Sequence, residues 1–103
     1  MLIVRSGNGV PVRLTDERWR HIIDRHPELA SFRDLVLNAV TEPDVVQEGD
    51  YGELIALRRE VVTPFGEKFV VVAYRELGEE DGFILTAYFA SRPSTGRKVL
   101  WTR

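Results

Sequence analysis

The sequence predicts an α+β fold in which two helices precede most of an antiparallel sheet. Apolar residues recur with helical spacing in the first half of the chain, and short strand-like runs separated by turns fill the second half. Strands grouped after helices favour an α+β arrangement over a parallel α/β fold. We expect an N-terminal hairpin and two helices packed on a sheet of four or more antiparallel strands, with the other sheet face available for a ligand.

The first predicted elements are a hairpin and a helix. Residues 2–4 and 10–12 are apolar and flank Gly7-Asn8-Gly9, which is a strong turn signal. Thr15 is a good N-cap for a helix that follows, and Pro27 ends it at or just before His26 because proline lacks the N–H that would continue the helix.

This helix has two distinct faces. Its apolar face has the spacing i, i+3, i+4 and i+7, and a neighbouring basic face has the spacing i, i+3 and i+7. The apolar face carries Trp19, Ile22, Ile23 and His26, and the basic face carries Arg18, His21 and Arg25.

A second helix is predicted to begin at Ser31, with Asp34 completing a loose capping box, and to end at residues 42–43. Strands are expected at residues 45–46, 53–62, 68–76, 83–90 and 99–101, because these runs are rich in β-branched and aromatic residues. In the 83–90 strand, alternation places Leu85 with Ala87 and Phe89 on one face. The expected core contains Trp19, Ile22, Ile23, Val70, Val72 and Leu85 or their same-strand neighbours.

Length and composition narrow the class of protein. The 103 residues suffice for one domain, 1–103, and the absence of cysteine excludes disulfides and thiolate metal sites. No segment has the length of a membrane span or signal peptide, so we expect a cytoplasmic protein with no membrane partner. The net charge of −2 is unusual for a protein that holds nucleic acid by bulk electrostatics, so any RNA contact requires a local basic patch.

His21 is the best single candidate for chemistry. Histidine exchanges a proton near neutral pH, and the neighbouring Arg18 and Arg25 are suited to holding phosphate. The same pattern is also typical of a solvated helix face. His26 shares the apolar face, so it is either catalytic or a half-buried residue that orients the site. A metal site formed by the two histidines is not expected, because positions five apart diverge by about 140° on a helix.

Further polar candidates lie on the predicted strands and the last loop. Arg58 and Arg59 are adjacent in a strand and therefore face opposite sides, so only one can reach a groove on the exposed face. Thr86 and Tyr88 share one strand face, where a tyrosine can bind phosphate, stack on a base or simply pack. Arg97 and Lys98 form a basic pair that is suited to phosphate but unspecific.

These residues resemble a known family of nucleases. The pattern comprises Leu14-Thr15-x3-Trp19-x-His21-Ile22-x2-Arg25-His26-Pro27-Glu28, then Pro43-Asp44, Arg59, Thr86-Ala87-Tyr88 and Leu100-Trp101. It is similar to the phage-type nucleases of the barnase–EndoU–colicin–RelE (BECR) superfamily, and the similarity covers nearly the whole chain.

The resemblance implies cleavage of RNA without a metal or cofactor, by a toxin or phage effector with an antitoxin or immunity protein as partner. The catalytic positions it implies are His21, His26, Arg59, Thr86 and Tyr88. The helix geometry adds Arg25, which lies beside His21 on the basic face, as a further catalytic candidate. We expect phosphate contacts from Arg18, Arg58, Arg97 and Lys98. The alternative is a non-catalytic nuclease-fold module that binds a protein or RNA partner.

Overall fold

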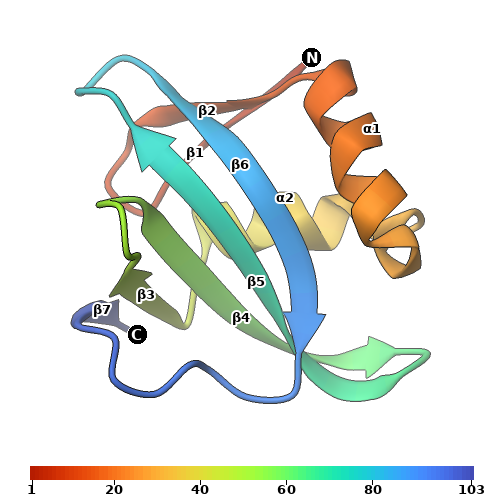
Figure 1. The fold of residues 1–103 in the computed structure, drawn as a ribbon. Coiled ribbons are helices and arrows are strands. Elements are labelled where there is room, and N and C mark those ends of the chain that lie inside the picture. The colour runs from red at the N-terminus through yellow and green to blue at the C-terminus, as the bar shows by residue number, and fades with distance from the viewer.

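The computed structural model describes residues 1–61 and 64–103. Their centre is a seven-stranded sheet with the order β1-β2-β6-β5-β4-β3-β7 (Figure 1). Two α-helices and one short 3₁₀ turn complete the fold: α1 (Asp16–Arg25), η1 (Pro27–Leu29) and α2 (Arg33–Thr41). The strands are β1 (Leu2–Arg5), β2 (Pro11–Leu14), β3 (Val45–Glu48), β4 (Leu54–Thr63), β5 (Gly66–Glu76), β6 (Gly82–Ala90) and β7 (Val99–Thr102). The α+β prediction is therefore confirmed.

The sheet is larger than expected and mixed, because the N-terminal hairpin joins it. Strands β2 and β6 run parallel and meet at Arg13 and Phe83, whereas the other neighbouring pairs are antiparallel. The prediction of an antiparallel sheet is wrong for this one pair. Arg13 explains the contact: it forms an ion pair with Asp81, and its guanidinium lies 5.5 Å from the centre of the Phe83 ring.

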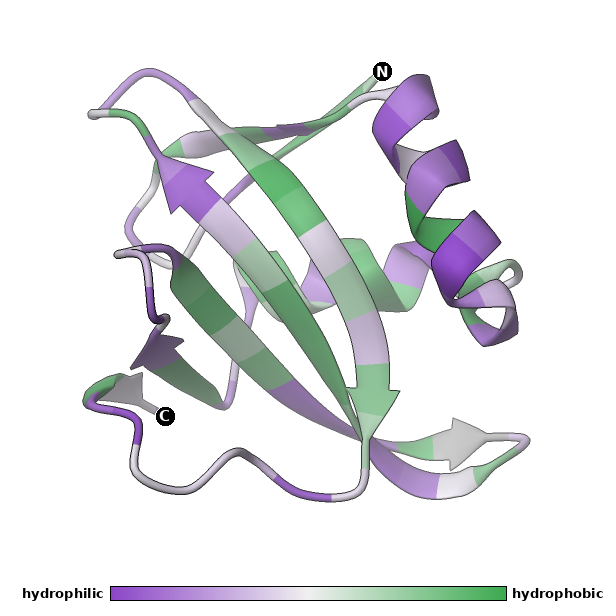
Figure 2. Cartoon of the chain, in the orientation of Figure 1, coloured by the Kyte–Doolittle hydropathy of each residue, from purple (hydrophilic) through white to green (hydrophobic). Residues whose placement is uncertain are grey.

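Helix α1 begins and ends where the sequence predicts. The Thr15 side chain accepts a hydrogen bond from the Arg18 backbone N–H (3.0 Å), and His26 is the C-cap residue. Ile22 is fully buried, but Trp19 is only half-buried at the margin of the core, so Ile22 is the anchor of the helix. The helix lies beside β6 (Figure 1), and most of its residues are hydrophilic (Figure 2).

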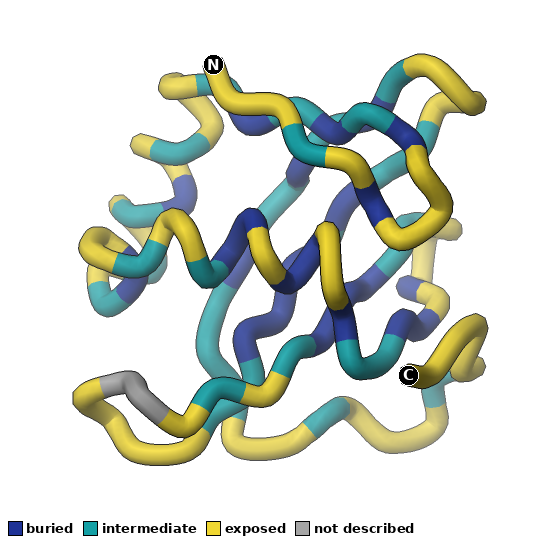
Figure 3. The backbone as a smooth tube through the Cα atoms, turned by 180° about the vertical axis from the view of Figure 1, so that it is seen from behind, coloured by how far each residue is buried: buried dark blue, intermediate teal, exposed yellow. Residues whose placement is uncertain are grey.

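Helix α2 begins two residues later than predicted, at Arg33, and its N-cap is Phe32, which makes no side-chain capping bond. The predicted capping box of Ser31 and Asp34 is therefore wrong. The Phe32 N–H instead donates to the Leu29 carbonyl (2.8 Å), and its ring packs edge-on against Phe89 at 5.6 Å. The helix packs on β4 and β5, and Figure 3 shows its inner side buried. Its buried residues are Val36, Leu37, Ala39 and Val40.

A β-bulge in β6 changes which side chains enter the core. Tyr74 pairs with Ile84 and the preceding Ala73 pairs with Thr86, so Leu85 has no partner on β5. Beyond the bulge the alternation is shifted by one residue. Ile84 is buried in place of Leu85, which stays partly exposed, so the prediction that groups Leu85 with Ala87 and Phe89 is wrong. Val70 and Val72 are fully buried as expected.

The sheet face away from α2 carries a second, smaller apolar cluster. Ile55, Leu57 and Val71 form it, and Phe69 and Tyr88 pack against it. This face is where β6 presents Thr86 and Tyr88 next to the C-terminal end of α1. Among the described residues, no helix is both long and apolar enough to cross a membrane.

Candidate active site

An open groove lies between α1 and β6. Helix α1 and its C-cap contribute four basic side chains, and β6 contributes three residues at and beyond the bulge. The described residues that line the groove are Arg18, His21, Arg25, His26, Leu85, Thr86 and Tyr88. The structure thus brings together most of the candidates that lie far apart in the sequence.

The groove exists because β6 extends beyond the point where it pairs with β2. The two strands pair at Arg13 and Phe83. Beyond this point, from Leu85 onward, α1 takes the place of β2 beside β6. Arg18 Nη1 donates a long hydrogen bond to the Leu85 carbonyl (3.4 Å), which links the helix to the strand. The bulge at Leu85 then shifts Thr86 and Tyr88 out of the core and into the groove wall.

His26 is held by two neighbours in the groove. Its ring centre lies 5.7 Å from that of Tyr88, and Nδ1 lies 3.5 Å from a Glu28 carboxylate oxygen. Both the His26 and Glu28 side chains are about one-third exposed. The ring contact and the nearby carboxylate together restrict the orientation of the imidazole. Glu28 belongs to the His-Pro-Glu motif, but nothing in the sequence alone marks it as the partner of His26.

His21 and Arg25 are exposed, and their side chains have no fixed partners in the part of the chain that the structure describes. Within residues 1–61 and 64–103 neither side chain makes a hydrogen bond or an ion pair. A cation without a carboxylate partner keeps its full charge for a bound anion, and an imidazole without a partner can accept or donate a proton. The His21 imidazole and the Arg25 guanidinium are therefore available to a ligand in the groove.

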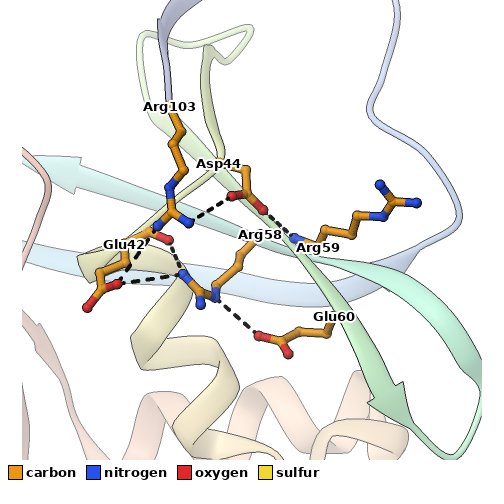
Figure 4. Close-up of polar contacts among 6 residues, drawn as sticks. All are labelled: Glu42, Asp44, Arg58, Arg59, Glu60 and Arg103. Atoms are coloured by element: carbon orange, nitrogen blue, oxygen red, sulfur yellow. Dashed lines mark hydrogen bonds and ion pairs between the residues drawn. The ribbon is translucent and has the colours of Figure 1, made fainter.

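Arg59 lies on the same sheet face as Tyr88 but does not line the groove. It is on β4, two strands from β6, which corresponds to about 10 Å across a sheet. Its guanidinium is paired with Glu67, which no sequence motif marks as a site residue. Its backbone N–H donates to the Asp44 carboxylate (2.8 Å; Figure 4). Arg59 thus has local partners on both its backbone and its side chain.

The remaining basic candidates also lie away from the groove. Arg58 is on the opposite face of β4, where it bonds Glu60 (3.2 Å) and the Glu42 carbonyl (2.6 Å; Figure 4). Arg97 pairs with Asp50 at 2.9 Å. Lys98 is exposed beside β3, where its carbonyl accepts from the Glu48 N–H. Of the four predicted phosphate contacts, the groove therefore contains Arg18 alone among the described residues.

The described residues contain no group of three or more His, Cys, Asp or Glu side chains placed to hold a metal ion. What the groove offers chemically is two imidazoles, a phenol and two guanidinium groups. No family model matches the chain, and neither the curated proteins nor the solved structures include a significant match to it.

Proposed function

We propose that the protein is an endoribonuclease whose active site is the groove between α1 and β6. The observation that carries the proposal is the convergence of His21, His26 and Tyr88 beside Arg25, which has no carboxylate partner among the described residues. Cleavage of RNA by its own 2′-hydroxyl needs a base, an acid and cationic stabilisation of phosphate, and this set of side chains supplies all three.

In the proposed reaction, His21 accepts the proton of a ribose 2′-hydroxyl. The 2′-oxygen forms a bond to the adjacent phosphorus, and the bond from phosphorus to the 5′-oxygen breaks. His26 delivers a proton to that leaving oxygen; with Nδ1 facing Glu28, Nε2 is the atom left for this transfer. The products are a 2′,3′-cyclic phosphate and a free 5′-hydroxyl.

The other groove residues hold the phosphate and the neighbouring base. Arg25 and Arg18 stabilise the charge that develops on the phosphoryl oxygens, because guanidinium groups form bidentate hydrogen bonds with phosphate. The Tyr88 ring stacks on a base or donates from its hydroxyl, and Thr86 next to it offers a second hydroxyl. This local basic site is compatible with the overall acidic composition, because recognition is confined to the groove.

The test is cleavage of a labelled single-stranded RNA by the purified protein in the presence of EDTA. We expect products that end in a 2′,3′-cyclic phosphate, and no cleavage where the attacking 2′-hydroxyl is replaced by hydrogen. His21→Ala should lose about 10²–10⁴-fold in rate with little change in thermal stability, because the side chain is exposed. Arg20→Ala, on the same helix but outside the groove, is the matched control.

Two results would contradict the proposal. Full activity of His21→Ala would remove the proposed base. Absence of cleavage for every RNA tried would favour the alternative, a nuclease-fold module that binds without catalysis, and RNA binding that depends on Arg25 would then identify RNA, not a protein, as its partner.

A further inference from the structure

A second cleft lies at a different part of the fold, between the β1–β2 turn, the end of α2 and β7. Its volume is about 370 Å³, which falls in the range of small-molecule sites, about 300–1,000 Å³. Gly7 comes from the turn, Thr41 from the end of α2, and Trp101 from β7. Among the described residues it shares none with the groove beside α1, so it needs its own explanation.

The cleft contains a buried polar group without a protein partner. Tyr74 on β5 is 1% exposed, and within the described part of the chain its hydroxyl makes no hydrogen bond. In that part of the chain, every completely buried side-chain oxygen or nitrogen has a hydrogen-bond partner. The unpartnered Tyr74 oxygen is therefore not completely buried, and the Tyr74 side chain lines the cleft. Burial, reinforced by Glu76, raises the pKa of Tyr74, so the hydroxyl stays protonated and acts as a donor.

The walls of the cleft are apolar and include a large aromatic ring. Trp101 is 49% and Leu100 43% exposed on β7, and Val46 lies beside Trp101 on β3. Pro43, which is buried, adds another apolar surface. A cleft lined by both a half-exposed indole and a buried hydroxyl suits a flat ring, because aromatic faces stack and an acceptor on the polar edge of the ring can accept a hydrogen bond from the hydroxyl.

The charges at the rim compensate one another. Arg103 lies 3.8 Å from Glu42 and 3.6 Å from Asp44, and Figure 4 shows these contacts. Glu42 also faces Arg58 at 3.9 Å. Glu42 and Arg103 are the charged side chains among the described residues that line the cleft, and because they are paired with each other, neither offers a free charge to an ionic ligand. This balance favours a neutral one.

We propose that this cleft binds a neutral planar heteroaromatic ring, the chemical class that includes the nucleobases. An acceptor atom on the ring edge receives the Tyr74 hydroxyl hydrogen bond, and the ring face packs against Trp101. The proposal does not depend on RNA cleavage at the other groove. The ring has two conceivable sources, a free small molecule or a base in a single strand, and the experiment separates them.

The experiment follows backbone amide shifts of the wild-type protein by NMR during titration with 4-methylpyridine and with toluene, at a pH where the pyridine is neutral. The two probes have similar shape, and only the pyridine has an acceptor. We expect saturable shifts at Gly7, Leu54 and Leu100, with tighter binding of 4-methylpyridine. Tyr74→Phe should weaken 4-methylpyridine about 2- to 10-fold and leave toluene unchanged. Tyr51→Phe, an exposed tyrosine outside the cleft, is the matched control.

Trp101→Ala provides a second variant that does not disturb the core, because the side chain is half-exposed on an edge strand. It should weaken both probes. Titrations with adenosine and with a short oligo(dA), which has no 2′-hydroxyl and so cannot be cleaved, then identify the source of the ring. Binding of adenosine alone indicates a free small molecule. Tighter binding of the oligonucleotide indicates a base in a single strand. The proposal is overturned if no probe gives saturable shifts around the cleft, or if the wild-type protein binds toluene and 4-methylpyridine equally.

Discussion

His26 and Tyr88 come from distant parts of the sequence, and their rings lie 5.7 Å apart with planes tilted by 32°. His26 caps the C-terminal end of α1, and Tyr88 lies on β6 beyond the bulge. The contact therefore joins the two sides of the groove at one point. It also explains why His26 shares the apolar spacing of α1 while remaining about one-third exposed: it packs against a ring at the margin of the core.

This ring contact predicts an energetic coupling between the two side chains. Aromatic pairs contribute about 0.5–1.5 kcal/mol to stability beyond the burial of their surface. A double-mutant cycle of His26→Ala and Tyr88→Ala should therefore give an interaction free energy in that range. Urea denaturation of both single variants and the double variant measures it. His21 and Tyr88 line the same groove without a ring contact among the described residues, and their cycle is the control that should be additive. Additivity for His26 and Tyr88 as well would argue against the contact.

Burial predicts that Ile22, not Trp19, is the residue of α1 on which stability depends most. Ile22 is completely buried, so Ile22→Ala should lower the free energy of unfolding by about 2–5 kcal/mol. Trp19 is partly exposed at the edge of the core, so Trp19→Ala should cost less than Ile22→Ala. Chemical denaturation with Arg20→Ala as the exposed control, expected within about 0.5 kcal/mol of wild type, tests this order. A larger loss for Trp19→Ala would contradict it.

The different partners of Arg25 and Arg59 predict different effects on RNA cleavage. Arg25 lines the groove without an ion pair among the described residues, whereas Arg59 is paired with Glu67 outside the groove. If Arg25 stabilises charge on the phosphoryl group, Arg25→Ala should lower kcat by about 10²–10³-fold, and Arg59→Ala should lower it less. Single-turnover cleavage of the same RNA compares them. A greater loss for Arg59→Ala would move the proposed phosphate site toward β4.

The sequence predicted the elements well where local signals are strong. Thr15 and Pro27 delimit α1, and the β-branched run around Val70 and Val72 marks a buried strand, because capping and side-chain alternation act over a few residues. The helical spacing of His21 and Arg25 also placed both on one face, and the structure places that face along the groove.

Features that depend on distant partners were not predictable in the same way. The parallel pairing of Arg13 with Phe83 joins segments far apart in the sequence. The alternation of apolar and polar residues predicts strands but does not indicate which strands are neighbours in the sheet. The bulge at Leu85 reverses the faces of β6, and one unpaired residue leaves no signal in the hydropathy pattern. Arg59 illustrates the same limit for the site, because its pairing with Glu67 depends on the β4–β5 register.

Tyr74 predicts how stability depends on alkaline pH. Its side chain is 1% exposed, and desolvation, with a smaller contribution from the negative charge of Glu76, raises its pKa above the ordinary value of 10.0. The folded protein therefore keeps the Tyr74 proton at a pH where the unfolded chain loses it. This contribution to stability is fully present below pH 10 and is lost as the pH rises toward the folded pKa.

We expect the free energy of unfolding of the wild-type protein to fall, relative to Tyr74→Phe, with a slope approaching about 1.4 kcal/mol per pH unit above pH ~10. Urea denaturation of both proteins from neutral pH to about pH 11 measures the difference, and groups that titrate in both cancel. Tyr51→Phe retains Tyr74 and should therefore keep the wild-type slope. Parallel profiles for wild type and Tyr74→Phe would show that the Tyr74 hydroxyl is hydrated in the folded protein as freely as in the unfolded chain, which would also remove the buried donor on which the second cleft depends.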